Sequence, residues 1–285
     1  MTSLKPGSVV VGVDGSPHSD SAVCWAATYA ALVSRPLLVV HATGRLSAGE
    51  LLGGPAEAQA MRDSAGARLT EEALLLARRL TPRLDIETVV AGGDPRQALI
   101  ELSQQAAMLV VGTRGHGPLT ALLLGSVSHA VVLHANCSVA VVRPNITPAA
   151  GVVVGVAGDG SDRAPLEFAA GLASAEGAEL DVVHAWRAVD SLAHALTAKQ
   201  RAETMHQHER ALAEAVAGLT EKFPDVQVNR HLPEHKAVDA LVERAEEADC
   251  VVVGSHGIAR GRAALGSVSR AVVEHAPVTV VVVRS

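Results

Sequence analysis

The chain has 285 residues and a net charge of −6; 48% of its residues are apolar but only 2% are aromatic. The acidic balance and the scarcity of aromatic side chains argue against a nucleic-acid partner. We expect a cytoplasmic protein without a membrane segment, because the start lacks a long apolar signal region, no apolar run approaches ~20 residues, and the three cysteines form no CxxC pair.

Short valine-rich runs alternate with helical patterns along the first half. These runs are continuously apolar, which is typical of strands buried on both faces of a sheet. We predict strands at 8–13, 37–42, 86–91, 108–112 and 138–142, and helices at 19–34, 57–81, 95–106 and 126–135.

The second half repeats this plan. The run Val9–Gly12 returns as Val152–Gly155, and His41 returns as His184, both with an offset of 143 residues. We predict strands at 151–156, 179–185, 226–231, 250–254 and 278–283, and helices at 162–176, 191–221, 236–247 and 267–275. A constant offset indicates a duplicated domain, so we predict domains at 1–146 and 147–285, joined near two prolines.

Alternating strands and helices imply parallel strands joined by right-handed crossovers. The sequence therefore predicts an α/β protein made of two tandem Rossmann-like, doubly wound domains, each with a five-stranded parallel sheet flanked by helices. Ligands of such sheets bind at the carboxyl ends of the strands where the strand order reverses. The candidate positions are Asp14, after the first strand, and the residues from Gly112 onward, after the fourth.

A glycine-spaced segment follows the fourth strand of each half. In the first copy Gly112, Gly115, Gly125 and Ser126 have the spacing Gly-x2-Gly-x9-Gly-Ser. Glycines let the backbone approach a ligand closely, and the helix that starts near Ser126 offers N–H groups to an anion. The segment therefore favours a bound phosphate. A tight turn that needs no ligand is the alternative interpretation.

The opening Gly-Val-Asp-Gly-Ser, the Val-Val-His-Ala of the second strand, and the glycine segment followed by Val-x-Ser resemble the universal stress protein family. The resemblance covers nearly the whole chain as two tandem domains. It implies a Rossmann-like domain, ATP held by the glycine motif in nucleotide-binding members, association through the fifth strand, and a role in stress or dormancy.

In the first half the resemblance implies that Gly12 and Asp14 lie beside the ribose and adenine, and that Val40 meets the adenine edge. It places the phosphates of ATP, with Mg2+, against Gly112, Thr113, Arg114, Gly115, His116, Gly117, Gly125, Ser126, Val127 and Ser128. A carboxylate such as Asp14 is suited to accept hydrogen bonds from ribose hydroxyls. A turn or helix-cap role for Asp14 is the alternative.

The second half departs from this pattern twice. Eight residues instead of nine separate Gly257 from Gly266, and Ala157 stands where the acidic residue is expected. Asp159, in a longer turn, is a candidate substitute. The corresponding positions are Gly155, Val183, Gly254, Ser255, Gly257, Gly266, Ser267 and Val268. We predict an intact nucleotide site in the first half and an altered one in the second.

Several enzyme templates are absent from the sequence: there is no Walker lysine motif, no GxSxG elbow and no HExxH zinc motif. We therefore assign no catalytic residue and no metal ligand, and expect His41 and His184 to be structural. The leading hypothesis is an ATP-binding regulatory or sensing module with slow or no hydrolysis. The alternatives are a nucleotide-independent interaction protein and, less favoured, a slow ATPase.

The fifth strands, SVAVVR and VTVVVVR, are valine-rich and would lie at sheet edges. Exposed apolar edges invite pairing with another strand. We therefore expect the two halves to pair through these strands, with a homodimer as a further option.

Overall fold

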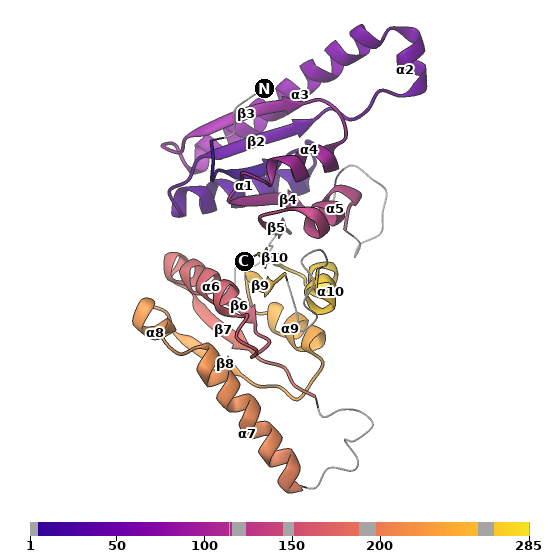
Figure 1. The fold of residues 1–285 in the computed structure, drawn as a ribbon. Coiled ribbons are helices and arrows are strands. Elements are labelled where there is room, and N and C mark those ends of the chain that lie inside the picture. The colour runs from indigo at the N-terminus through magenta and orange to yellow at the C-terminus, as the bar shows by residue number, and fades with distance from the viewer. Residues whose placement is uncertain are drawn as a thin grey trace. The chain divides into compact units, whose positions relative to one another are not determined.

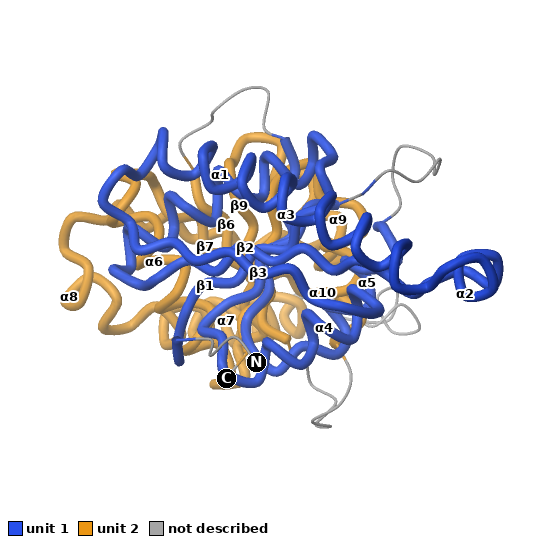
Figure 2. The backbone as a smooth tube through the Cα atoms, turned by 90° about the horizontal axis from the view of Figure 1, so that it is seen from above, with its two compact units in different colours: residues 1–144 blue, residues 145–285 orange. Residues whose placement is uncertain are grey.

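A computed structural model of the chain describes residues 5–113, 115, 124–144, 151–187, 198–255 and 265–284. The chain divides into two compact units, residues 1–144 and 145–285 (Figure 2). The sequence places the domain boundary two residues later, between residues 146 and 147.

The first unit is a parallel sheet with helices on both faces (Figure 1). Its strands are β1 (Val9–Gly12), β2 (Leu37–Ala42), β3 (Ile86–Ala91), β4 (Met108–Gly112) and β5 (Ser138–Val142), in the order β3-β2-β1-β4-β5. Helices α1 (Pro17–Leu32) and α3 (Pro55–Leu80) pack together on one face, and α4 (Pro95–Leu102) and α5 (Ser126–His134) pack together on the other.

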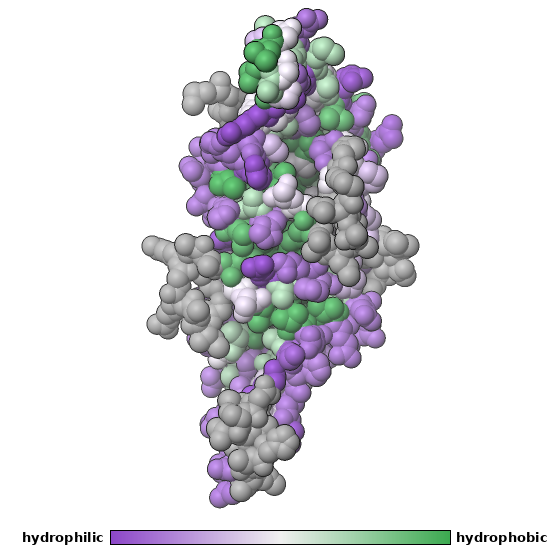
Figure 3. All heavy atoms as spheres, turned by 90° about the vertical axis from the view of Figure 1, so that its right-hand side faces the viewer, coloured by the Kyte–Doolittle hydropathy of each residue, from purple (hydrophilic) through white to green (hydrophobic). Residues whose placement is uncertain are grey.

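A short helix, α2 (Ala48–Gly53), lies where the sequence predicted none. It begins with a capping box, in which the Ser47 side chain accepts from the Glu50 N–H and the Glu50 carboxylate accepts from the Ser47 N–H. Arg62 of α3 bonds both Glu50 oxygens at 2.9 Å and so ties α2 to α3. The helix leaves Leu51 and Leu52 exposed, and apolar side chains gather at the top of Figure 3.

The second unit has the same architecture. Its strands are β6 (Gly151–Gly155), β7 (Glu179–Val183), β8 (Val228–His231), β9 (Cys250–Gly254) and β10 (Thr279–Val283), in the order β10-β9-β6-β7-β8. Its helices are α6 (Arg163–Glu176), α7 (Ala198–Ala215), α8 (Leu219–Lys222), α9 (Ala237–Ala245) and α10 (Ser267–His275).

The prediction of a single long helix at 191–221 is wrong in part. Within the described residues it is two helices, α7 and α8, because Gly218 adopts a φ of 81° between them. Residues 191–197 lie outside the described part of the chain. A left-handed backbone at glycine ends a helix without strain, which accounts for the break.

The strand order reverses at the same point in both units. In the first unit β1 pairs with β2 on one side and β4 on the other, and in the second β6 pairs with β7 and β9. All of these pairs are parallel, so the carboxyl ends of the strands share one edge. The predicted fold class is therefore confirmed, and Gly12, Gly112, Gly155 and Gly254 end the four strands at the two reversal points.

Candidate functional site

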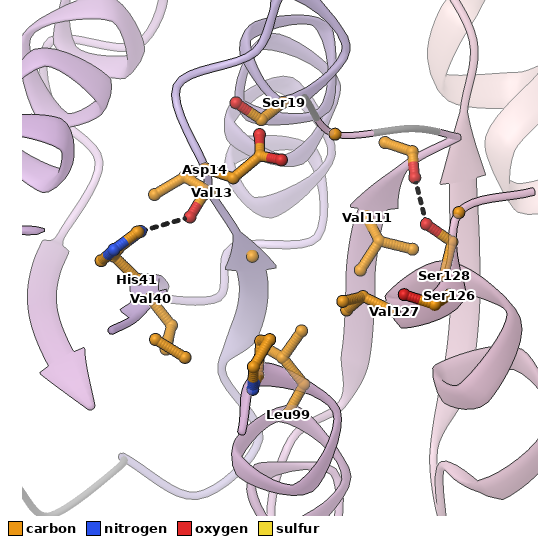
Figure 4. A pocket seen from close by; sticks show the side chains of 16 residues that line it. Val13, Asp14, Ser19, Val40, His41, Leu99, Val111, Ser126, Val127 and Ser128 are labelled. Carbon is orange, nitrogen blue, oxygen red and sulfur yellow. Dashed lines mark hydrogen bonds between the residues drawn. The ribbon is translucent and has the colours of Figure 1, made fainter. Parts of the chain in front are cut away.

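A cavity of about 350 Å³ lies at the carboxyl ends of β1, β2 and β4 in the first unit (Figure 4). Helix α4 and the start of α5 complete its wall. The structure brings most predicted first-half residues together around it: Gly12, Asp14, Val40, Gly112, Gly115, Gly125, Ser126, Val127 and Ser128. The cavity lies where the strand order predicts a ligand site.

The start of α5 is held in place but not capped by a side chain. Gly125 is the N-cap residue, and its N–H donates to the Thr113 carbonyl at 2.8 Å. The Ser128 hydroxyl donates to the Gly112 carbonyl at 2.6 Å, which fixes the first turn of α5 against the end of β4. The N–H groups of a first helical turn have no acceptor within the helix. This end of the cavity is therefore suited to an anion.

Asp14 lies in the turn between β1 and α1. Its Oδ1 accepts from the Ser16 N–H at 3.0 Å, and Ser16, not Asp14, is the N-cap of α1. A Cβ atom built on Gly115 would overlap the Asp14 Oδ2 atom, so the glycine segment passes directly against this carboxylate. The alternative interpretation of Asp14 as a turn residue therefore holds for Oδ1, while Oδ2 lies against Gly115.

An apolar slot forms the wall between β2 and α4. Val40 and Leu99 are 1% and 3% exposed, and both line the cavity (Figure 4). Pro95 lines it as well. A Cβ on Gly12 would approach Leu99 Cδ1 to 3.0 Å, so Gly12 is required for packing as well. Pro95 and Leu99 were not singled out from the sequence. Their signal was Asp94-Pro95, a cap residue and a first-turn proline that start α4.

Several predicted residues do not line the first cavity. Thr113 is buried, and its Oγ1 lies 3.2 Å from His18 Nδ1 in the first turn of α1. Gly112, which does line the cavity, packs against the same turn, where an added Cβ would lie 2.7 Å from the His18 carbonyl oxygen. Arg114, His116 and Gly117 lie outside the described residues.

A second cavity, of about 580 Å³, occupies the equivalent place in the second unit. Gly155, Val183, Gly254, Gly266, Ser267 and Val268 line it, whereas Ser255 is buried and does not. The start of α10 repeats that of α5: the Ser269 hydroxyl donates to the Gly254 carbonyl at 2.6 Å, and the Gly266 N–H to the Ser255 carbonyl at 3.0 Å. Gly257 and the shortened spacing after it lie outside the described residues.

The acidic residue of the second loop is Asp162, which the sequence reasoning missed. Its two carboxylate oxygens accept from the N–H groups of Ala157 and Gly158, each at 2.7 Å, and the residue is 6% exposed. Asp159, the predicted substitute, instead accepts from Ser161 in an exposed turn and does not line the cavity. In the sequence, Asp162 is visible only as a further acidic residue three positions after Asp159 in the same loop.

A histidine lies near the carboxyl end of the second strand in both units: His41 is the last but one residue of β2, and His184 directly follows β7. The Nδ1 of His41 lies 2.9 Å from the Val13 carbonyl and that of His184 lies 3.1 Å from the Val156 carbonyl. A carbonyl only accepts, so in both residues Nδ1 carries the proton. His184 Nε2 then accepts from His208 Nδ1 at 2.9 Å. The Nδ1 bonds tie each histidine to the residue that follows the first strand of its unit.

Two further features of the described residues bear on function. They contain no group of three or more His, Cys, Asp or Glu side chains placed to hold a metal ion. No helix among them combines the length and the apolar character that a bilayer crossing requires.

Comparison with known proteins gives one consistent family. The universal stress protein family model matches residues 7–143 and again 151–284. Universal stress protein Rv2005c of Mycobacterium tuberculosis is 37% identical, covering 98% of each chain, and Rv2623 of the same species is 34% identical, covering 97% of this chain and 96% of its own. The crystal structure of a universal stress protein from Archaeoglobus fulgidus superposes with a TM-score of 0.68 over 99% of each chain, at 20% identity. The chain therefore belongs to the universal stress protein family, as a member with two tandem domains.

Proposed function

We propose that the first unit binds ATP and that the protein acts in the cytoplasm as a regulatory or sensing module of a stress response. The carrying observation is that an uncapped helix start, a carboxylate and an apolar slot converge on one cavity. Each of these three features suits a different part of a nucleotide.

In this proposal the phosphates lie against the N–H groups of Ser126, Val127 and Ser128, where the helix dipole favours negative charge. The ribose hydroxyls donate to the Asp14 carboxylate, and the adenine enters the slot beside Val40 and Leu99. Glycine at position 115 lets the backbone pass against Asp14, where a Cβ would overlap the Asp14 Oδ2 atom. Mg2+ enters bound to the phosphate oxygens of ATP.

A nucleotide-independent interaction protein is the second candidate. Gly12 and Gly112 both have packing reasons to be glycine, because a Cβ would press on Leu99 in one case and on the His18 backbone in the other. These two glycines would therefore be required even without a ligand. Packing does not explain why Asp14 and the uncapped start of α5 share one cavity.

Titration calorimetry and native mass spectrometry on freshly purified protein test the proposal. We expect one ATP per chain, with the affinity lowered by about tenfold or more in Asp14→Ala, because a charge-assisted hydrogen bond is lost. Asp159→Ala is the matched control, since Asp159 is the exposed acid of the second loop, and it should bind as the wild type does. A folded protein that binds no ATP at millimolar concentration would favour the interaction protein instead.

Hydrolysis is a separate question. We propose slow or no turnover, since the described cavity wall contains no acid, base or arginine beyond Asp14 and His41, and His41 is engaged with a carbonyl. Steady turnover above roughly 1 s⁻¹ would instead place the protein among ordinary enzymes.

The association proposal rests on the strand order within each unit. β5 and β10 each end the strand order of their own unit, and most of their residues are valine. We propose that the two units pair through these strands and that a homodimer can form in addition. Hydrogen exchange should then protect β5 and β10 as strongly as β1 and β6; fast exchange would contradict the pairing. Light scattering decides the homodimer independently.

A further inference from the structure

The loops after the first strand of each unit differ in the position of one carboxylate. With the repeat offset of 143 residues, Asp14 corresponds to Ala157 and Ser19 corresponds to Asp162. Each unit therefore has one acid and one small residue at these two positions, in opposite order. All four residues line the cavity of their own unit.

In the second unit both carboxylate oxygens of Asp162 are hydrogen-bonded within the loop. It stands at the N-cap position of α6 but makes no side-chain cap to that helix. Both of its oxygens accept backbone N–H groups, those of Ala157 and Gly158, at 2.7 Å. Such bonds stabilise a buried carboxylate, and they point its acceptors into the loop rather than toward a ligand.

In the first unit Ser19 cannot perform this role. Its hydroxyl donates to the Ser16 carbonyl at 2.9 Å, and its N–H donates to the Ser16 hydroxyl at 3.2 Å, so it belongs to the start of α1. Asp14 remains at the strand side of the loop and lines the cavity (Figure 4). Gly115 lies against its Oδ2 atom.

Two other parts of the described cavity wall, the slot and the helix start, correspond in the two units. The slot residues Val40 and Leu99 correspond to Val183 and Leu241, and each residue of the second pair is 3% exposed. The start of α5 corresponds to the start of α10, with the same serine-to-carbonyl bond of 2.6 Å. The position of the acid therefore differs between walls whose slot and helix start correspond.

We propose that Asp162 is a specificity-determining residue: by holding the loop itself, it replaces the ligand-facing carboxylate and removes ribose recognition from the second cavity. The chain then has one site that selects a ribonucleotide, in the first unit. This inference rests on the proposed function of that unit. Restoring the site requires both exchanges, because Ala157→Asp alone places a second carboxylate beside Asp162, and Asp162→Ser alone supplies no acceptor.

The test transfers the first unit's arrangement to the second. ATP and 2′,3′-dideoxy-ATP are titrated into the wild type, Ala157→Asp/Asp162→Ser and the two single variants. We expect one site in the wild type that prefers ATP by about tenfold or more, the effect of one charge-assisted hydrogen bond. The double variant should gain a second site with the same preference, and neither single variant should gain one.

The outcomes separate the inference from the proposed function. A wild type with two sites of equal ribose preference, or a folded double variant that gains no second site, overturns the inference while leaving ATP binding by the first unit intact. A wild type that binds no ATP overturns both.

If the double variant fails to fold, the reciprocal Asp14→Ala/Ser19→Asp decides the inference. Asp14→Ala alone already removes the ribose preference, so the deciding comparison is stability: adding Ser19→Asp should raise the urea midpoint of the first unit above that of Asp14→Ala, and no gain overturns the inference.

Discussion

The two units have the same strand order and differ where the first strand meets its helix. In the first unit the turn is short: α1 begins at Pro17, capped by Ser16. In the second, α6 begins at Arg163, three residues later in the repeat, and Asp162 closes the longer loop. A duplicated sheet can thus keep its core and its cavity while one loop changes the chemistry at the cavity wall.

A second difference lies beside the histidines near the carboxyl ends of β2 and β7. In the first unit Gly66 of α3 lies against His41, where an added Cβ would come within 2.8 Å of His41 Cδ2. In the second unit α7 instead presents His208, which bonds His184 and stacks on Trp186 with ring centroids 5.3 Å apart. The same strand-end histidine is covered by bare backbone in one unit and by an imidazole in the other.

The two tryptophans allow each unit to be followed separately, because Trp25 lies in the first and Trp186 in the second. Variants carrying Trp186→Phe or Trp25→Phe therefore report the unfolding of one unit by fluorescence. The stability predictions below use these two backgrounds.

The largest effect is expected from the slot leucines. Leu99→Ala and Leu241→Ala each remove a side chain that is 3% exposed, and each should cost its own unit about 3 kcal/mol in urea unfolding. Only Leu99→Ala should also weaken ATP binding. Equal loss of ATP binding in both variants would show that the units are functionally alike.

The next largest effect is expected for Asp162→Ala. It should lower the free energy of unfolding of the second unit by about 2 kcal/mol, because two N–H groups lose a charged acceptor. The matched change Ser19→Ala removes one hydroxyl bond from the first unit and should cost about 1 kcal/mol. The Trp186 and Trp25 unfolding midpoints measure the two costs. Equal costs would contradict the distinct role assigned to Asp162.

The serines that fix the ligand-facing helices should give smaller, matched effects. Ser128→Ala and Ser269→Ala each remove one hydroxyl-to-carbonyl bond of 2.6 Å, so each should destabilise its unit by about 1 kcal/mol. Chemical denaturation in the two single-tryptophan backgrounds measures this. A clear inequality between them would mean that the two helix starts are held differently.

The smallest effect concerns pH. Burial, and then the charge of His184, lowers the pKa of His208, so the folded second unit binds this proton less readily than the unfolded chain does. The resulting stability is fully present above the ordinary histidine value, about 6.5, and declines as the pH falls below it. The Trp186 unfolding midpoint should therefore drop between pH 7.5 and 5.5, and less so in His208→Gln. An identical drop in that variant would exclude His208 as the cause.

Much of the fold could be predicted because its signals are local and repeated. The valine runs fix which segments are buried strands, and a constant offset between the halves makes each prediction support its counterpart. Helix α2 escaped prediction because it is six residues long and is stabilised by Arg62, which lies on another helix. The break at Gly218 was not predicted because a glycine inside a helical pattern does not by itself reveal its φ.

The parts of the candidate site that depend on backbone geometry could be predicted from the sequence. The parts that depend on which hydrogen bonds and contacts a side chain makes were harder to predict. The glycines and the start of α5 follow from spacing alone. The role of Asp162 does not, because an acid before a helix normally predicts a cap, whereas here both oxygens turn back to the preceding loop. Leu99 was missed because its place in the cavity depends on how α4 packs across the strand ends.

The central claim is that the first unit holds the nucleotide, and a crystal structure grown with ATP and Mg2+ tests it most directly. Difference density calculated before any nucleotide is built should appear in the cavity of the first unit, with the phosphates at the start of α5 and the ribose beside Asp14. The cavity of the second unit should show no comparable density. An empty first cavity, or equal nucleotide density in both, would contradict the account.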